Sequence, residues 1–214
     1  MPLPMVHLAI AVLAHEMSGR PLTPEFVLGS LAPDAIHMRP GTNREDKTRV
    51  HMDIWQLSEP DVHERIQNLV DQHCSGKNGQ GIFVEGYAAH VMTDYWWLQG
   101  IARPFFEQFA PDTPHEERRD WYYRETDQVD FNLYHRAPWR LAVWGLLASA
   151  CAPEFSPYLT ADEIDRWRQR TLNWFEKLKQ EPGIVPQIIT DEVVGEFIQV
   201  TAQRIQPFLF ERGK

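Results

Sequence analysis

The sequence predicts an all-α protein, a single-domain multi-helix bundle, on three observations. Apolar residues recur at helical spacing in most segments, short stretches containing proline and glycine separate these segments, and no pair of strands can be recognised. The 214 residues are 43% hydrophobic and 24% charged, as is typical of one globular domain. No repeat, low-complexity tract or linker divides the chain, so we expect one helical domain over residues 1–214.

The first quarter of the chain predicts two helices and a loop. Apolar periodicity over residues 5–18 indicates a helix that ends at Gly19. A shorter helix is expected over residues 24–30, because a proline follows at position 33. Residues 38–47 are polar and contain proline and glycine, so we expect a loop there.

A central helix is predicted in the middle of the chain. Pro60 favours a helix start, and that helix is expected over residues 59–73, before a glycine-rich loop at 75–81. Residues 82–98 are apolar on most of the helix circumference, which predicts that the other helices surround them. Further helices are expected over residues 114–135, 138–150, 160–180 and 191–208. The helix over residues 160–180 opens with a capping box of Thr160 and Glu163.

The charge of the chain argues against several kinds of partner. Thirty Asp and Glu against 21 Lys and Arg give a formal charge of -9 without any basic run, so nucleic acid and a polybasic membrane contact are not expected. The first apolar segment lacks the basic start and the cleavage site of a signal peptide, and no window predicts a membrane span. Cys74 and Cys151 lie far apart, as expected for reduced, partly buried thiols in a cytoplasmic protein.

His90 and Asp94 are the polar exceptions in the predicted central helix. Their spacing of four residues places both side chains on one helix face, about one turn apart. An imidazole and a carboxylate are costly to bury unless they pair with each other or bind a metal ion. The spacing suits a single transition-metal ion, and a buried hydrogen bond between the two side chains is the alternative.

Three other segments carry candidate polar ligands. His7 lies in the middle of the apolar first helix, where either a buried core histidine or a metal ligand fits. Asp34 follows a proline at a helix end, a rigid position that suits a ligand or a plain turn. His51 and Asp53 would point the same way in an extended segment, whereas in a helix only one of them can face inward.

Several common hydrolase motifs are absent from the sequence. It contains no His-Asp dipeptide, no Glu-x-x-His pattern of di-iron bundles and no His-Glu-x-x-His zinc-protease helix. A Gly-x-Ser-x-Gly elbow and a phosphate-binding glycine loop are missing as well. If the protein is an enzyme, a metal-activated water is the best remaining nucleophile.

The order of the candidate residues is informative as a set. A histidine in the first helix is followed by Leu28-Gly-Ser-Leu-Ala-Pro-Asp34, Lys47-x-x-x-His51 and Gly86-Tyr-Ala-Ala-His-Val-Met-Thr-Asp94. Over about residues 1–135 this arrangement resembles the zinc-dependent phospholipase C family, particularly its small bacterial hydrolase-like members. Residues 122–131 are also similar to a stretch of those small members.

The resemblance implies an all-helical fold with a metal cluster between helices, in which a carboxylate activates water for attack on a phosphodiester. Carried over residue by residue, it implies five metal ligands, with Asp34 also acting as the catalytic base: His7, Asp34, His51, His90 and Asp94. Gly100 stands where the secreted enzymes continue with a histidine, and their His-x-x-x-Glu pair is absent. One or two ions of zinc or another divalent transition metal are therefore expected, rather than three.

Three acidic residues of the helix predicted over residues 114–135 could complete a reduced site, namely Glu125, Asp127 and Asp130. Glu125 and Asp130 are five residues apart and do not share a helix face cleanly. The alternative is that this helix simply presents a solvated acidic face.

The sequence as a whole favours a cytoplasmic metal-dependent hydrolase of phospholipase C-like chemistry. We expect a phosphoester or phosphodiester substrate, either a small molecule or lipid-like. The alternative is a non-catalytic helical binding or scaffold protein with an incomplete metal site. A nuclease of the same fold is a third hypothesis, which the negative charge of the chain disfavours. The helices over residues 138–210 are expected only to pack and close the bundle.

Overall fold

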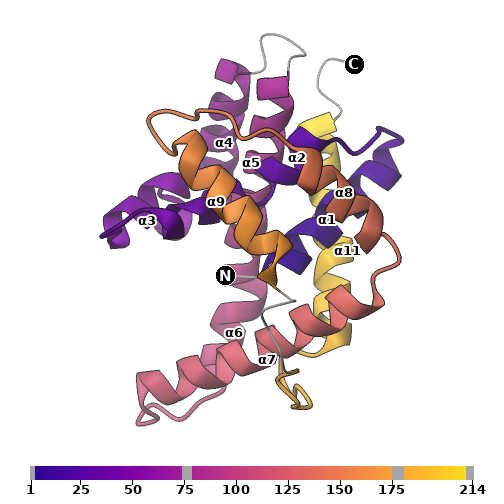
Figure 1. The fold of residues 1–214 in the computed structure, drawn as a ribbon. Coiled ribbons are helices and arrows are strands. Elements are labelled where there is room, and N and C mark those ends of the chain that lie inside the picture. Colours follow the sequence, from indigo (N-terminus) through magenta and orange to yellow (C-terminus); the bar gives the residue numbers. More distant parts are fainter. Residues whose placement is uncertain (1–2, 74–78, 175–180, 211–214) are drawn as a thin grey trace.

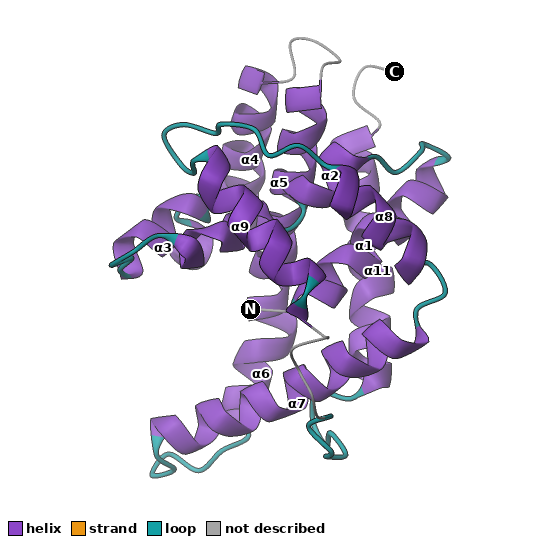
Figure 2. Cartoon of the chain, viewed as in Figure 1, coloured by secondary structure: helices purple, strands orange, loops and turns teal. Residues whose placement is uncertain are grey.

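The computed structural model describes residues 3–73, 79–174 and 181–210. Helices dominate this part of the chain, and its only extended pairing is an isolated bridge between Phe155 and Leu159 (Figure 2). The predicted all-α class is confirmed. Among the described helices, none is long and apolar enough to cross a membrane.

Ten α-helices are described, joined by shorter helical segments (Figure 1). In chain order the α-helices are α1 (Pro4–Ser18), α2 (Pro24–Gly29), α3 (Arg44–Val50), α4 (Glu59–His73), α5 (Gly79–Trp97), α6 (Arg103–Glu107), α7 (His115–Arg136), α8 (Arg140–Ser149), α9 (Ala161–Leu172) and α11 (Asp191–Phe210). The connecting segments are the 3-10 helices η1 (Ala32–Met38) and η2 (Ile54–Gln56) and the π-helix η3 (Leu98–Ala102).

Local chemistry sets several of the helix ends. Gly19 stops α1 in the left-handed conformation, with φ of 68°, which a residue without Cβ adopts freely. The hydroxyl of Thr23 accepts the N–H of Phe26 at the start of α2. Thr160 and Glu163 form the predicted capping box at the start of α9, because each side chain accepts the other residue's N–H.

Some predicted boundaries are wrong. The loop predicted over residues 38–47 contains the start of α3, because Asn43 and Asp46 form a second capping box that the sequence reading overlooked. Residues 79–81 belong to α5 rather than to the predicted loop, of which residues 75–78 lie outside the described part. Helix α9 ends at Leu172, and residues 175–180 of its predicted extension also lie outside. Cys151 is exposed rather than partly buried, and Cys74 is not described.

Helix α5 is the central helix, as the apolar circumference of residues 82–98 predicts. It packs against α1, α2, α4 and α11, and Figure 1 shows α4 alongside it. Both tryptophans at its end, Trp96 and Trp97, are buried in the core. Every side chain that α5 directs inward therefore lies where water is excluded.

Helices α2 and α5 cross at two glycines. A Cβ atom at Gly86 would lie 2.3 Å from the carbonyl oxygen of Phe26, and a Cβ atom at Gly29 would lie 2.1 Å from the carbonyl oxygen of Phe83. No real Cβ tolerates such distances, so only glycine permits this approach. The close crossing brings the C-terminal end of α2 next to the face of α5 that carries His90.

An ion pair between distant parts of the chain fixes α9 over η1. The Arg39 guanidinium donates to both carboxylate oxygens of Glu163, at 2.7 and 3.0 Å, and to the carbonyl of Tyr158 at 2.9 Å. Bidentate contacts of this kind fix orientation as well as distance. Helix α9 is thereby placed against η1, the segment that carries Asp34.

We expect Gly86→Ala to lower the free energy of unfolding by about 3 kcal/mol, because the added methyl forces α2 and α5 apart. Denaturant unfolding measures the change. Gly195→Ala in α11 is the matched control, since its Cβ meets nothing within 4 Å; it should stabilise the protein by roughly 0.5–1 kcal/mol. Similar effects of the two substitutions would contradict the close crossing.

Candidate metal centre

The structure brings together all five residues that the sequence proposes as metal ligands. Helix α1 supplies His7, η1 supplies Asp34, the residue after α3 is His51, and α5 supplies His90 and Asp94. Asp34 is 8% exposed and the other four are at most 2% exposed. Residues from four separate segments thus form one buried polar cluster inside an apolar core.

Asp94 is the centre of this cluster. Its Oδ2 atom lies 3.3 Å from Nε2 of His51 and 3.6 Å from Nε2 of His90, and its Oδ1 atom lies 3.5 Å from Nε2 of His7. Oδ1 of Asp34 lies 3.8 Å from the same Nε2 of His51. None of these buried atoms has a hydrogen-bond partner within the described residues.

Backbone carbonyls fix the tautomers of two of the histidines. Nδ1 of His90 donates to the carbonyl of Ser30 at 2.9 Å, and Nδ1 of His51 donates to the carbonyl of Lys47 at 2.8 Å. Because a carbonyl only accepts, each neutral ring carries its proton on Nδ1 and presents a lone pair on Nε2. These lone pairs point at a carboxylate, which is also an acceptor. A metal ion, or a proton on one of these Nε2 atoms, compensates acceptors that face each other in this way.

The distances fit a metal ion better than hydrogen bonds. An N–H···O hydrogen bond has its usual length near 2.9 Å, and all four contacts are longer. Two ligands of a tetrahedral zinc ion, each about 2.0–2.1 Å from the metal, are separated by about 3.4 Å. Two overlapping triads have their ligand atoms within 4.8 Å of one another: His7, His90 and Asp94, and Asp34, His51 and His90.

The electrostatics of the cluster favour an ionised Asp94. Burial opposes charge on both His90 and Asp94, but their mutual attraction outweighs it, so the pKa of His90 is raised and that of Asp94 is held well below its usual range. Burial, with His90 beside it, lowers the pKa of His7 to about 4. The His7 ring stacks on the His90 ring with centroids 3.8 Å apart. Near neutral pH the cluster therefore combines an ionised carboxylate with a neutral His7.

The backbone after His51 is unusual. Met52 and Asp53 both have positive φ, 61° and 52°, a conformation that non-glycine residues seldom adopt. Arg65 holds this turn by donating to the carbonyl of Met52 at 2.8 Å. The turn directs His51 into the core and leaves the Asp53 side chain 59% exposed. Of the two residues that the sequence left as alternatives, His51 is the inward one.

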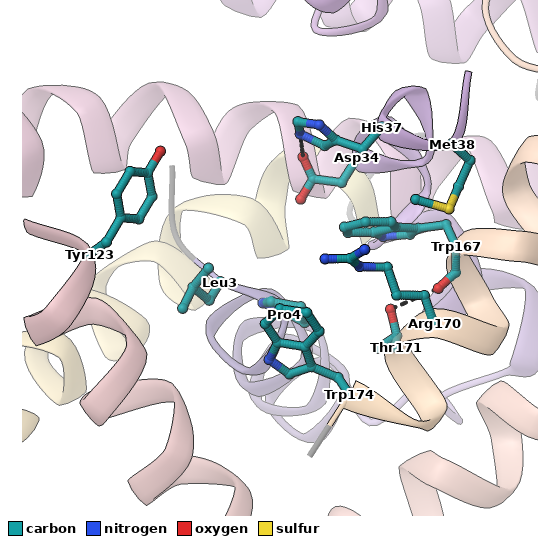
Figure 3. A pocket seen from close by; sticks show the side chains of 10 residues that line it. All are labelled: Leu3, Pro4, Asp34, His37, Met38, Tyr123, Trp167, Arg170, Thr171 and Trp174. Carbon is teal, nitrogen blue, oxygen red and sulfur yellow. Dashed lines mark hydrogen bonds and ion pairs between the residues drawn. The ribbon is translucent and has the colours of Figure 1, made fainter. Parts of the chain in front are cut away.

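The cluster reaches solvent through a cavity of about 430 Å³. Asp34 is the one member of the five that lines it, together with His37 of η1, Tyr123 of α7, and Trp167 and Arg170 of α9 (Figure 3). Helix α9 thus contributes to the site, whereas the sequence reading gave the C-terminal helices a packing role only. The sequence feature that could have indicated this contribution is the helical spacing of Trp167, Arg170 and Trp174, which places them on one helix face.

Glu125 is completely buried but has a different set of partners. Its carboxylate accepts the backbone N–H groups of three successive residues, Gln187, Ile188 and Ile189, with shortest distances of 2.7, 3.1 and 2.7 Å. These bonds tie α7 to the segment before α11. The structure does not place Glu125 in either of the two ligand triads.

Asp130 and Asp127 also lie outside the ligand triads. Oδ1 of Asp130 accepts the N–H of Met5 at 2.9 Å and so satisfies the first turn of α1, the helix of His7. Burial raises the pKa of Asp130 well above its usual range and also raises that of the half-buried Asp127. Asp130 thereby contributes to positioning the helix that carries a proposed ligand.

Comparisons of the chain with protein-family models, curated proteins and solved structures give no match. The candidate metal centre is therefore supported by the geometry of the cluster and by the sequence pattern of its residues.

We expect one or two equivalents of zinc or another divalent transition metal in the purified protein by elemental analysis. His90→Ala should lose this metal, because both ligand triads share His90. Chelation of the wild type should lower its melting temperature, since removal of the ion leaves facing acceptors buried. The exposed His115→Ala is the control and should keep the metal. A wild type that neither contains nor takes up metal would contradict the assignment.

We expect Glu125→Gln to destabilise the fold by about 2 kcal/mol, because charge-assisted bonds to three backbone N–H groups are weakened. Metal content should stay at the wild-type value. Loss of metal in this variant, with the fold retained, would instead place Glu125 among the ligands. Thermal unfolding and elemental analysis of the same sample separate the two results.

Proposed function

We propose that the protein is a metal-dependent hydrolase of phosphoesters or phosphodiesters. The observation that carries the proposal is the convergence of three imidazole Nε2 atoms and two carboxylates, without hydrogen bonds between them, beside a cavity that one of those carboxylates lines. A metal site that opens on one side to a cavity is the arrangement of catalytic rather than structural metals. The sequence resemblance to zinc-dependent phospholipases C points to the same chemistry.

The donor set fits a divalent transition metal. Imidazole nitrogens and carboxylate oxygens bind zinc, and also iron, manganese or nickel. Asp34, His51, His90 and Asp94 would supply four ligand atoms to one ion, and His7 lies on the other oxygen of Asp94, where it would serve a second ion or complete the first. The carbonyls of Ser30 and Lys47 orient the rings from outside, as is common in metal sites.

When bound, such an ion lowers the pKa of a coordinated water and polarises a phosphoryl oxygen. Asp34 is the base in this proposal, because it alone joins the cluster to the cavity. Its carboxylate takes a proton from the attacking water as the new phosphorus–oxygen bond forms and the ester bond breaks. The leaving alcohol takes up a proton that solvent supplies through the cavity. His51, His90 and Asp94 would hold the ion and take no part in the proton transfer.

A scaffold protein with a purely structural histidine–aspartate cluster is the alternative class. It would need hydrogen bonds between the buried groups, and the contacts of 3.3–3.8 Å offer poor ones. A nuclease stays disfavoured by the charge of -9. Action in the cytoplasm and a small or lipid-like substrate stay predictions from the sequence.

We expect Asp34→Asn to reduce hydrolysis of bis(p-nitrophenyl) phosphate by the metal-loaded protein at least about 100-fold, because the amide cannot accept the proton of the attacking water. Elemental analysis should show that the variant still holds metal through its remaining ligands.

Asp112→Asn is the matched control for this substitution. It makes the same chemical change on an exposed side chain that belongs neither to the cluster nor to the lining of the cavity. Its activity should equal that of the wild type. Full activity in Asp34→Asn would remove Asp34 from the role of base. A metal-loaded wild type that hydrolyses no phosphoester would favour the scaffold alternative.

A further inference from the structure

The cavity beside Asp34 has one wall from a distant helix. Helix α9 contributes Trp167, Arg170 and Thr171 to it, with Trp174 just beyond the helix end. Figure 3 shows the Arg170 side chain extending between these aromatic groups into the same space that the carboxylate of Asp34 faces. The positive charge of an exposed side chain therefore shares this cavity with the edge of the proposed metal centre.

Arg170 is held by two aromatic rings. The carbon of its guanidinium lies 5.5 Å from the centroid of the Trp167 ring and 4.8 Å from the centroid of the Trp174 ring. Contacts with aromatic faces attract a cation and restrict the side chain without using its N–H donors, which have no hydrogen-bond partner among the described residues. The guanidinium is thereby oriented for another acceptor.

The other arginines of α9 differ from Arg170 in their partners. Arg166 pairs with Asp162 at 2.9 Å, and Arg168 pairs with Asp165 at 2.6 Å. Arg170 has no carboxylate within ion-pair distance among the residues that the structure describes. Within the described part of the chain it is therefore the arginine of α9 that lines the cavity without a carboxylate partner.

Charge balance indicates what this ligand is. One divalent ion held by Asp34 and Asp94 would have its two positive charges offset by the two carboxylates. Arg170 adds a positive charge, and a guanidinium binds two phosphoryl oxygens at once. Trp167, Trp174 and Tyr123 offer flat apolar surfaces for the rest of the molecule. A substrate with a positively charged substituent would instead be repelled by the Arg170 guanidinium.

We propose, resting on the proposed hydrolase function, that Arg170 is the anion-binding residue of this cavity. It selects compact phosphoesters whose leaving group is apolar or aromatic and carries no positive charge. The residue acts in binding and orientation of the phosphoryl group. Esters of choline or ethanolamine are poor substrates on this account.

Binding of inorganic phosphate to the metal-loaded protein, measured by titration calorimetry, tests the anion site without catalysis. Arg170→Met should weaken phosphate binding about 10- to 100-fold at unchanged metal content, the range expected for loss of a charge-assisted contact. Arg124→Met is the matched control, because that guanidinium lies 5.6 Å from the ring of exposed Trp121, away from the lining of the cavity. Wild-type affinity in Arg170→Met, or no phosphate binding by the wild type, would overturn the proposal.

The choice of substrate is tested with two diesters that differ in charge. The wild type should prefer bis(p-nitrophenyl) phosphate to p-nitrophenyl phosphorylcholine in kcat/KM, and Arg170→Met should reduce that preference severalfold, mainly through KM. An unchanged preference would overturn the assignment of specificity to Arg170. If no ester is hydrolysed but phosphate binding still depends on Arg170, the result contradicts the proposed hydrolase function and supports the anion-binding site.

Discussion

The buried carboxylate of Asp94 is the constraint on which the rest of the structure depends. It lies on the central helix, is 1% exposed, and is surrounded by ring nitrogens rather than by hydrogen-bond donors of fixed geometry. A charge in such a place is stable only when other segments bring a compensating cation or its ligands to it. Helix α1, η1 and the turn after α3 all converge on that point, so the arrangement of the N-terminal half is inseparable from the chemistry of this one side chain.

Packing and polar geometry support each other around Asp94. The glycine crossing of α2 and α5 sets the position of the Ser30 carbonyl, and that carbonyl fixes the tautomer of His90. The strained turn at Met52 and Asp53, which Arg65 holds, directs the His51 side chain into the core. Strain and close approach of this kind are costly and persist where the surrounding structure holds a functional group in place. Rigid support around the ligands is what a metal site requires.

The sequence predicted the fold class, the central helix and the His90–Asp94 pair, because helical periodicity determines which residues share a face. The convergence of His7, Asp34 and His51 on that pair was expected from family resemblance, since no local rule specifies which helices meet. Glu125 could not be assigned, because its partners are backbone N–H groups more than sixty residues away. The role of α9 was missed for the same reason: its position depends on the contact of Arg39 with Glu163, 124 residues apart.

The contact between Arg39 and Glu163 joins the part of the chain that carries the proposed metal ligands to α9, which forms one wall of the cavity. All five proposed ligands lie between positions 7 and 94. Arg170 and Trp167 of the cavity wall belong to α9, and Trp174 lies two residues beyond its end. The proposed metal ligands and the proposed anion-binding residue therefore lie in separate stretches of the sequence that meet only in the folded chain. Substitutions in α9 can therefore change the lining of the cavity while all five proposed ligands stay the same.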